Sequence, residues 1–219
     1  MFSRISLSLL LLLSAVLIGC SGDETPATPE PPATPAEHTS QGWQNFEARH
    51  YSDALTDFNT ALAKDADFGP ALAGKGWCEL KLSVSSAGLD QAATDFSAAL
   101  LSGETETYVL AGLASVRLAQ GGLFLGQAAS MATSVISEDP DFQFSHQGTI
   151  DTTDMILILA FSKAAAGEFS LALEQANLIQ SSSIDLDNPG TWFVSNEQFS
   201  SFNAAVLARL YQLSEQYSG

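Results

Sequence analysis

Apolar residues recur along most of the chain with the period of an α-helix. The segments 51–62 (YSDALTDFNTAL) and 89–100 (LDQAATDFSAAL) both carry apolar side chains three and four positions apart. Such spacing gives a helix one apolar face that can pack into a core. Short breaks separate these segments from their neighbours, as in DADFGP before Ala71, SGE before Thr105 and AQGG before Leu123. The pattern predicts an all-α protein made of successive helices.

The helical segments also repeat one another. The two segments above share their small and apolar positions with segments 128–140 and 169–179, and the matching small residues are Ala54, Ala92, Ala128 and Ala172. The preceding segments are related as well, and their common small position holds Gly42, Gly76, Ala114 and Ala160. A hairpin of two such helices leaves an apolar side that only the next hairpin can cover, so we expect a stack of hairpins.

This pattern resembles the tetratricopeptide repeat family, whose unit is a hairpin of two helices, A and B, of about 34 residues. The small residues fit the positions where helices A and B cross, and Tyr51 and Phe169 fit the aromatic position near the start of helix B. The family repeat commonly ends in a proline, and among the four repeats of this chain only the third has one, Pro140. The resemblance covers residues 39–181 and implies an α-solenoid of about four hairpins, which a helix over 195–217 would cap at the C-terminal end.

A different pattern precedes the repeats. Residues 6–18 are predominantly apolar and follow a single positive charge, Arg4. This stretch has the length of a signal-peptide core and is shorter than the roughly 20 apolar residues that span a bilayer. The block LIGC at 17–20 resembles the lipobox of bacterial lipoproteins. That resemblance implies a signal peptide over residues 1–19 and a lipid-modified mature N-terminus at Cys20.

The resemblance to lipoproteins also implies a location. In lipoproteins of bacteria with two membranes, an Asp after the cysteine tends to keep the protein in the inner membrane, so Ser21 implies the outer membrane. Residues 20–38 hold the cysteine and a proline-rich segment, which we interpret as a disordered tether reaching roughly 50 Å. The repeat domain, residues 39–219, would then face the periplasm or the cell exterior.

Charge and cysteine content narrow the range of possible partners and of possible disulfide bonds. The chain has 8 basic and 25 acidic residues, for a net charge of −17. Nucleic acid and anionic membrane surfaces would repel such a protein, and we interpret the excess as favouring solubility over a dedicated cation-binding or basic-partner surface. Cys78, the second of two cysteines, lies in an apolar helical pattern. We expect it to be a buried, inert thiol without a disulfide partner.

The sequence lacks a recognisable catalytic constellation. It has no nucleophile-elbow motif, no phosphate-binding loop and no zinc-protease motif. His38, His50 and His146 are scattered and have no metal-ligand spacing. The segment DLDNPG at 185–190 lacks the later glutamate of a calcium loop and is expected to be an Asp-rich turn. We therefore expect neither an enzyme nor a cofactor or metal site.

The candidate binding residues are aromatic or apolar positions of the predicted A helices. Trp43, Trp77 and Phe161 directly follow the common small position, where the third repeat has Ser115, and the candidate partner groove consists of Trp43, Phe46, Trp77, Leu80 and Phe161. These rings are either the floor of a groove or core residues between helices, and both interpretations stay open. Lys81 has no basic counterpart, because Glu47, Ala119 and Ala165 stand at the equivalent places. A clamp for a C-terminal carboxylate is therefore not expected.

Together these patterns predict a membrane-anchored scaffold of the bacterial envelope that holds another envelope protein, with no nucleic-acid partner. The alternative is a glycan-binding or nutrient-uptake lipoprotein that stacks sugars on Trp43, Trp77 or Trp192. Exposure discriminates between the two, because sugar stacking needs indoles on an open surface.

Overall fold

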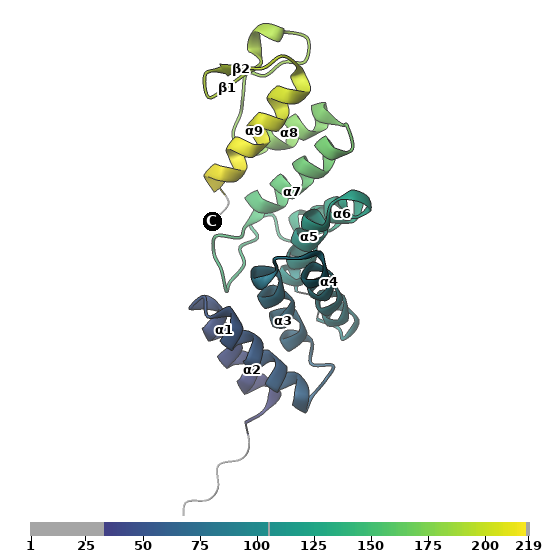
Figure 1. The fold of residues 1–219 in the computed structure, drawn as a ribbon, viewed down its shortest axis with the longest axis vertical. Helices are drawn as coiled ribbons and strands as arrows, with labels where there is room; N and C mark the ends of the chain where they lie inside the picture. Colours follow the sequence, from purple (N-terminus) through teal and green to yellow (C-terminus); the bar gives the residue numbers. More distant parts are fainter. Residues whose placement is uncertain (1–32, 105, 218–219) are drawn as a thin grey trace, which may run out of the picture. The chain divides into compact units, whose positions relative to one another are not determined.

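The computed structural model describes residues 33–104 and 106–217, and its helices follow one another as antiparallel hairpins (Figure 1). The hairpins are α1 (Pro35–Glu47) with α2 (Tyr51–Lys64), α3 (Gly69–Leu82) with α4 (Ser86–Leu101), α5 (Thr107–Gln120) with α6 (Leu125–Glu138), and α7 (Thr152–Ala165) with α8 (Phe169–Ile179). Each hairpin packs on the next one, and α9 (Phe202–Tyr217) packs on α7 and α8. The predicted all-α solenoid of four hairpins with a final helix is confirmed.

Helix α1 begins earlier than the sequence pattern suggested. The Thr34 side chain accepts a hydrogen bond from the Glu37 N–H at 3.2 Å, while the Glu37 carboxylate accepts one from the Thr34 N–H. This reciprocal capping box, with a proline at the first helical position, starts the helix at Pro35. The helical domain therefore begins before residue 39, and residues 35–38, which were predicted to belong to the tether, are helical. The predicted signal peptide and Cys20 lie outside the described residues.

Glycine and phenylalanine make the close contacts between hairpins. The Phe58 ring of α2 lies against Gly42 of α1, where an added Cβ would come within 2.7 Å of a ring carbon, and also against Gly74 of α3. Phe96 of α4 takes the same place between Gly76 of α3 and Gly112 of α5. The B helices of the first two hairpins, α2 and α4, thus each insert one ring between their own helix A and the next. The predicted small positions Ala54, Ala92, Ala128 and Ala172 are all fully buried at these crossings.

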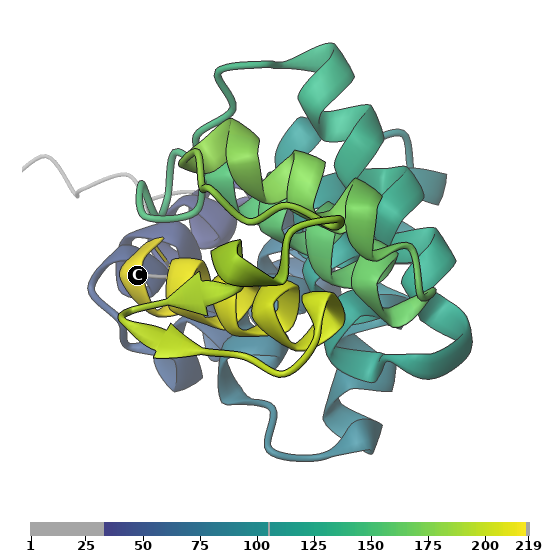
Figure 2. The same ribbon diagram turned by 90° about the horizontal axis from the view of Figure 1, so that it is seen from above.

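The segment before α9 differs from the predicted helix over 195–217. Strands β1 (Phe193–Val194) and β2 (Glu197–Gln198) form an antiparallel hairpin beside α9 (Figure 2). Its two turn residues, Ser195 and Asn196, have φ of 50° and 68°, which suits a tight two-residue hairpin turn and excludes a helix. The helix therefore starts at Phe202, and its inner face packs on the last hairpin through Phe202, Val206, Leu210 and Leu213.

Two short 3₁₀ turns complete the described part of the chain, η1 (Gly122–Phe124) and η2 (Pro189–Thr191). The η2 turn belongs to the Asp-rich segment, where the Asp187 N–H donates to the Asp185 carboxylate at 2.9 Å. The predicted Asp-rich turn is therefore present. Among the described helices, none combines the length and apolar character needed to cross a bilayer.

Candidate functional site

Residues 139–151, between α6 and α7, fold back over the earlier hairpins, and we call them the strap. The Phe144 N–H donates to the Ile150 carbonyl at 2.8 Å, and the Thr152 N–H donates to the Phe142 carbonyl at 2.9 Å. Gln143 also pairs with Asp151 as an isolated antiparallel bridge. These bonds reverse the chain direction inside the strap. In Figure 1 the strap reaches from α7 toward α1.

The strap inserts Phe144 among four rings of the A helices. We call these rings, Trp43, Phe46, Trp77 and Tyr108, the aromatic cradle. The Phe144 ring lies nearly parallel to those of Trp77, at 4.5 Å, and Tyr108, at 5.7 Å between centroids. Trp43 and Phe46 meet it edge-on at 5.9 and 6.0 Å. Such pairs contribute about 0.5–1.5 kcal/mol each beyond area burial, and Phe144 is fully buried.

His146 forms a second contact between the strap and α1. Its imidazole lies flat on the Trp43 indole, with centroids 3.9 Å apart and an interplanar angle of 2°. Its Nδ1 lies 2.8 Å from Oε1 of Glu47, which is 99 residues away in sequence. The strap therefore covers both tryptophans of the A helices, since Phe144 stacks on Trp77 and His146 stacks on Trp43.

These contacts decide between the two interpretations of the tryptophans. Trp77 is 1% exposed and Trp43 is 8% exposed, so both are core residues beneath the strap. Phe46, at 1%, is also core. Trp192 is half-buried, and its Nε1–H donates to the Asp185 carbonyl at 2.7 Å. The two tryptophans of the A helices thus offer no open indole face of the kind that sugar stacking requires.

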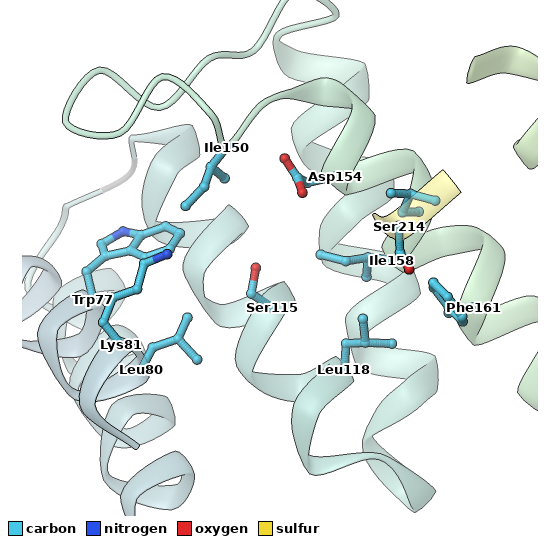
Figure 3. Close-up of a pocket in the computed structure, with 11 residues that line it drawn as sticks. Trp77, Leu80, Lys81, Ser115, Leu118, Ile150, Asp154, Ile158, Phe161 and Ser214 are labelled. Carbon is cyan, nitrogen blue, oxygen red and sulfur yellow. The ribbon is translucent and has the colours of Figure 1, made fainter. Parts of the chain in front are cut away.

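Beside the strap, an open cavity of about 300 Å³ lies on the face formed by the A helices (Figure 3). We call it the helix A cavity. Its lining comes from α3, α5, the strap, α7 and α9, and consists of Trp77, Leu80, Lys81, Ser115, Leu118, Ile150, Asp154, Leu157, Ile158, Phe161 and Ser214. Most of these side chains are apolar, so the cavity suits an apolar group of a ligand.

Two opposite charges stand at this cavity, one on each side. Lys81 comes from α3 and Asp154 from α7 (Figure 3). Burial lowers the pKa of the Lys81 amine, although nearby Asp154 opposes the change. Burial likewise raises the pKa of Asp154, although the hydrogen bond from the Asp151 N–H opposes it. Among the described residues neither side chain takes part in a salt bridge, so both can hydrogen-bond to a ligand.

The Asp154 carboxylate is held in place by the start of α7. Asp151 caps this helix by accepting from the Thr153 N–H at 2.7 Å, and Asp154 accepts from the Asp151 N–H at 3.0 Å. This capping box uses one carboxylate oxygen of Asp154 and fixes the side chain beside the cavity. The strap and the helix start therefore position the cavity wall together.

A separate charged cluster joins α3 to α4. Lys75 pairs with Asp95 at 3.1 Å and with Glu79 at 3.7 Å. Burial first, and then Asp95, raises the pKa of the Glu79 carboxyl to about 8. Beside it, burial and then the Glu79 charge raise the pKa of the Cys78 thiol to about 12. Cys78 is fully buried, which confirms the expected buried thiol, and a thiol with such a pKa is unreactive at neutral pH.

The structure brings together only part of the predicted groove. Trp77, Leu80 and Phe161 line the helix A cavity, whereas Trp43 borders a neighbouring depression beside His146 and Phe46 is enclosed. Sequence reasoning missed Leu118, Ile150, Asp154 and Ile158. The alternating aromatic residues of FQFSH, within a polar loop, could have indicated a segment that returns to the core. Within the described ranges, no group of three or more His, Cys, Asp or Glu side chains is placed to hold a metal ion.

Comparison with known proteins supports the fold. No family model matches the sequence, and no curated protein matches it. YrrB, described as a TPR protein with an unusual peptide-binding site, is 14% identical and has a TM-score of 0.53, covering 83% of this chain and 87% of its own. MamA (MSR-1 C2) is also 14% identical, with a TM-score of 0.56 and coverage of 83% and 97%. The chain therefore has a tetratricopeptide-like fold.

Proposed function

We propose that this protein is a binding scaffold, and that it holds an extended segment of a partner protein at the helix A cavity. The observation that carries this proposal is the cavity itself, an apolar pocket on the A helices with Lys81 and Asp154 on opposite sides. A solved protein of similar fold is described with a peptide-binding site, which supports the same kind of ligand.

The chemistry of the cavity favours a peptide over a sugar or a charged small molecule. Its volume of about 300 Å³ matches one or two apolar side chains, lying at the lower end of ligand pockets. A peptide main chain offers one carbonyl and one N–H next to each side chain. Lys81 can donate to such a carbonyl, and Asp154 can accept from such an N–H. The covered indoles of Trp43 and Trp77 remove the main support for glycan binding.

The envelope location is part of the same proposal. The lipobox-like LIGC block and the proline-rich segment after it support a lipid anchor at Cys20 and a tether to the domain. Two or more acyl chains are needed for a stable hold on a membrane, and the lipoprotein resemblance implies them. The partner would then be another protein of the envelope, at the outer membrane.

The test compares one apolar residue of the cavity with one outside it. Leu118 lines the cavity, whereas Leu101, at the end of α4, is 89% exposed. Proteins captured from solubilised membranes of the native organism would be quantified for Leu118→Asp, for Leu101→Asp and for the unchanged protein. We expect Leu118→Asp alone to lose a specific partner by tenfold or more, equivalent to about 1.4 kcal/mol. If a folded Leu118→Asp captures the same proteins equally well, the cavity is not the binding site.

A further inference from the structure

The strap occupies the aromatic cradle in the manner of a bound peptide. We propose that the cradle is a second peptide-binding site, which takes an extended partner segment with an aromatic residue two positions before a planar N–H donor. The chain's own Phe144 and His146 fill it in this structure. This site goes beyond the proposed function; it shares Trp77 with the helix A cavity but has a test of its own.

The first argument is the way in which the strap is held. Its main-chain hydrogen bonds run within the strap or to the adjacent α6 and α7, as in Phe144 to Ile150, Gln147 to Phe144 and Ile150 to Gln147. Among the described residues, its one hydrogen bond to α1, α3 or α5 is the contact between His146 and Glu47. The remainder of the attachment is side-chain packing, to which Phe142 and Ile150 contribute beside Phe144 and His146. The strap can therefore leave the cradle as a unit without breaking any backbone ladder.

The second argument is the shape of the Phe144 subsite. The rings of Trp77 and Tyr108 lie within 19° and 16° of the Phe144 plane, and Trp43 and Phe46 close the edges. Stacked and edge-on ring contacts of this kind favour an aromatic ring over a branched aliphatic side chain, which cannot stack. The subsite therefore specifies the aromatic residue of the partner segment.

The third argument is the polarity of the His146 subsite. The Trp43 face takes a planar group at 3.9 Å, and the Glu47 carboxylate receives the nitrogen at its edge. A histidine or an arginine satisfies both contacts, because each is planar and carries N–H donors. The Glu47 carboxylate at this subsite further favours a partner side chain with a positive charge. In the strap sequence Phe-Ser-His, one residue, Ser145, separates the residues that fill the two subsites.

The strap competes with any external segment. Because the strap is covalently joined to α6 and α7, its effective concentration at the cradle is in the millimolar range. A free peptide of equal affinity therefore cannot displace it at micromolar concentration. An external segment binds when the strap rings are removed or when the partner makes further contacts. Ile150 belongs to both the strap and the wall of the helix A cavity, so a partner seated there would touch the strap.

The experiment empties the cradle and supplies the strap sequence as a separate peptide. The protein is the double variant Phe144→Ala with His146→Ala, and the probe is a synthetic peptide of residues 141–149, DFQFSHQGT. We expect the peptide to bind the double variant at least tenfold more tightly than the unchanged protein, measured by tryptophan fluorescence and calorimetry. A control peptide with alanine in place of its second phenylalanine should bind at least tenfold less tightly than the strap peptide.

Thermal melting keeps the proposal testable if the double variant is poorly folded. A ligand that binds the native state stabilises that state by mass action. The strap peptide should therefore raise the melting temperature of the double variant, or restore its helical circular dichroism signal, and this effect should saturate with increasing peptide concentration. The control peptide should do neither. Absence of both binding and rescue by the strap peptide would overturn the second site. The helix A cavity would be unaffected by that result, because its own test uses Leu118.

Discussion

The ring of Phe96 in α4 lies against the bare Cα of Gly112 in α5, so closely that a Cβ at position 112 would overlap it. This contact joins the second hairpin to the third, and Phe58 and Gly74 make the equivalent contact between the first and the second. The stack is therefore held at each of these junctions by one phenylalanine inserted against a glycine.

Gly112→Ala should destabilise the domain by about 1–3 kcal/mol, because the added methyl group overpacks a fully enclosed ring. The matched control is Gly126→Ala in α6, where nothing lies within 4 Å of the added Cβ. That change should be neutral or stabilising by up to about 1 kcal/mol, since alanine favours a helix. Urea unfolding of both variants measures the difference. Equal stabilities would show that the Phe96 contact is looser than described.

Trp77→Ala should lower the free energy of unfolding by about 3–5 kcal/mol, as expected for a large enclosed side chain. Trp77 is 1% exposed and stacks on Phe144, so removing the indole leaves a cavity beneath the strap. Circular dichroism melting with a urea titration measures the loss. A variant that keeps its stability would contradict the placement of Trp77 in the core.

Stability should fall with rising pH because of Glu79, whose pKa is raised to about 8 in the folded protein. The unfolded chain has an ordinary glutamate pKa of about 4.3, so in the window between these values the folded state binds more protons. The contribution of protonated Glu79 to the free energy of unfolding is complete below the unfolded pKa. It is lost as the pH rises through about 8, the pKa in the folded protein. Glu79→Gln should flatten this dependence between pH 5 and pH 8.

Urea titrations at several pH values measure that effect, and Glu215→Gln, on an exposed position of α9, is the control. The control should keep the pH dependence of the unchanged protein. A Glu79→Gln profile parallel to that of the control would show that Glu79 does not titrate in this window.

Cys20→Ala should release the protein from the membrane fraction and abolish incorporation of a fatty-acid probe. The reason is that the acyl chains proposed to hold the protein on the membrane are attached at this residue. Cell fractionation with metabolic labelling checks it. Cys78→Ala is the matched control, because Cys78 is buried in the domain. Labelling that persists in Cys20→Ala would contradict the lipoprotein interpretation.

The sequence predicted the hairpins well because their signal is local and repeated. Helical periodicity, the recurring alanines and Gly42 and Gly76 all report contacts between helices that are neighbours in the chain. The start of α1 was misplaced because the Thr34–Glu37 capping box lies inside a segment whose prolines indicate an extended tether. The β-hairpin at 193–198 was missed because its turn, Ser195–Asn196, carries no glycine.

The candidate site was harder to predict than the fold because it depends on the strap. Phe144 meets Trp43, and His146 meets Glu47, over about a hundred residues of sequence, and no periodic pattern reports such a contact. The tryptophans were recognised as sharing one helix A position, but their burial follows from the returning strap. The helix A cavity likewise needs Ile150 and Asp154, which lie just before and at the start of α7.

The most direct test of the account places a photo-reactive phenylalanine analogue at position 161, inside the helix A cavity, in cells of the native organism. The analogue at position 193 is the control, because Phe193 is 45% exposed and does not line the cavity. After irradiation, crosslinked proteins are isolated and sequenced by mass spectrometry. We predict that position 161 crosslinks to one envelope protein, through one extended segment with an apolar residue, and that position 193 does not. The same crosslinks from both positions, or none from position 161, would contradict the proposal that the helix A cavity holds a partner.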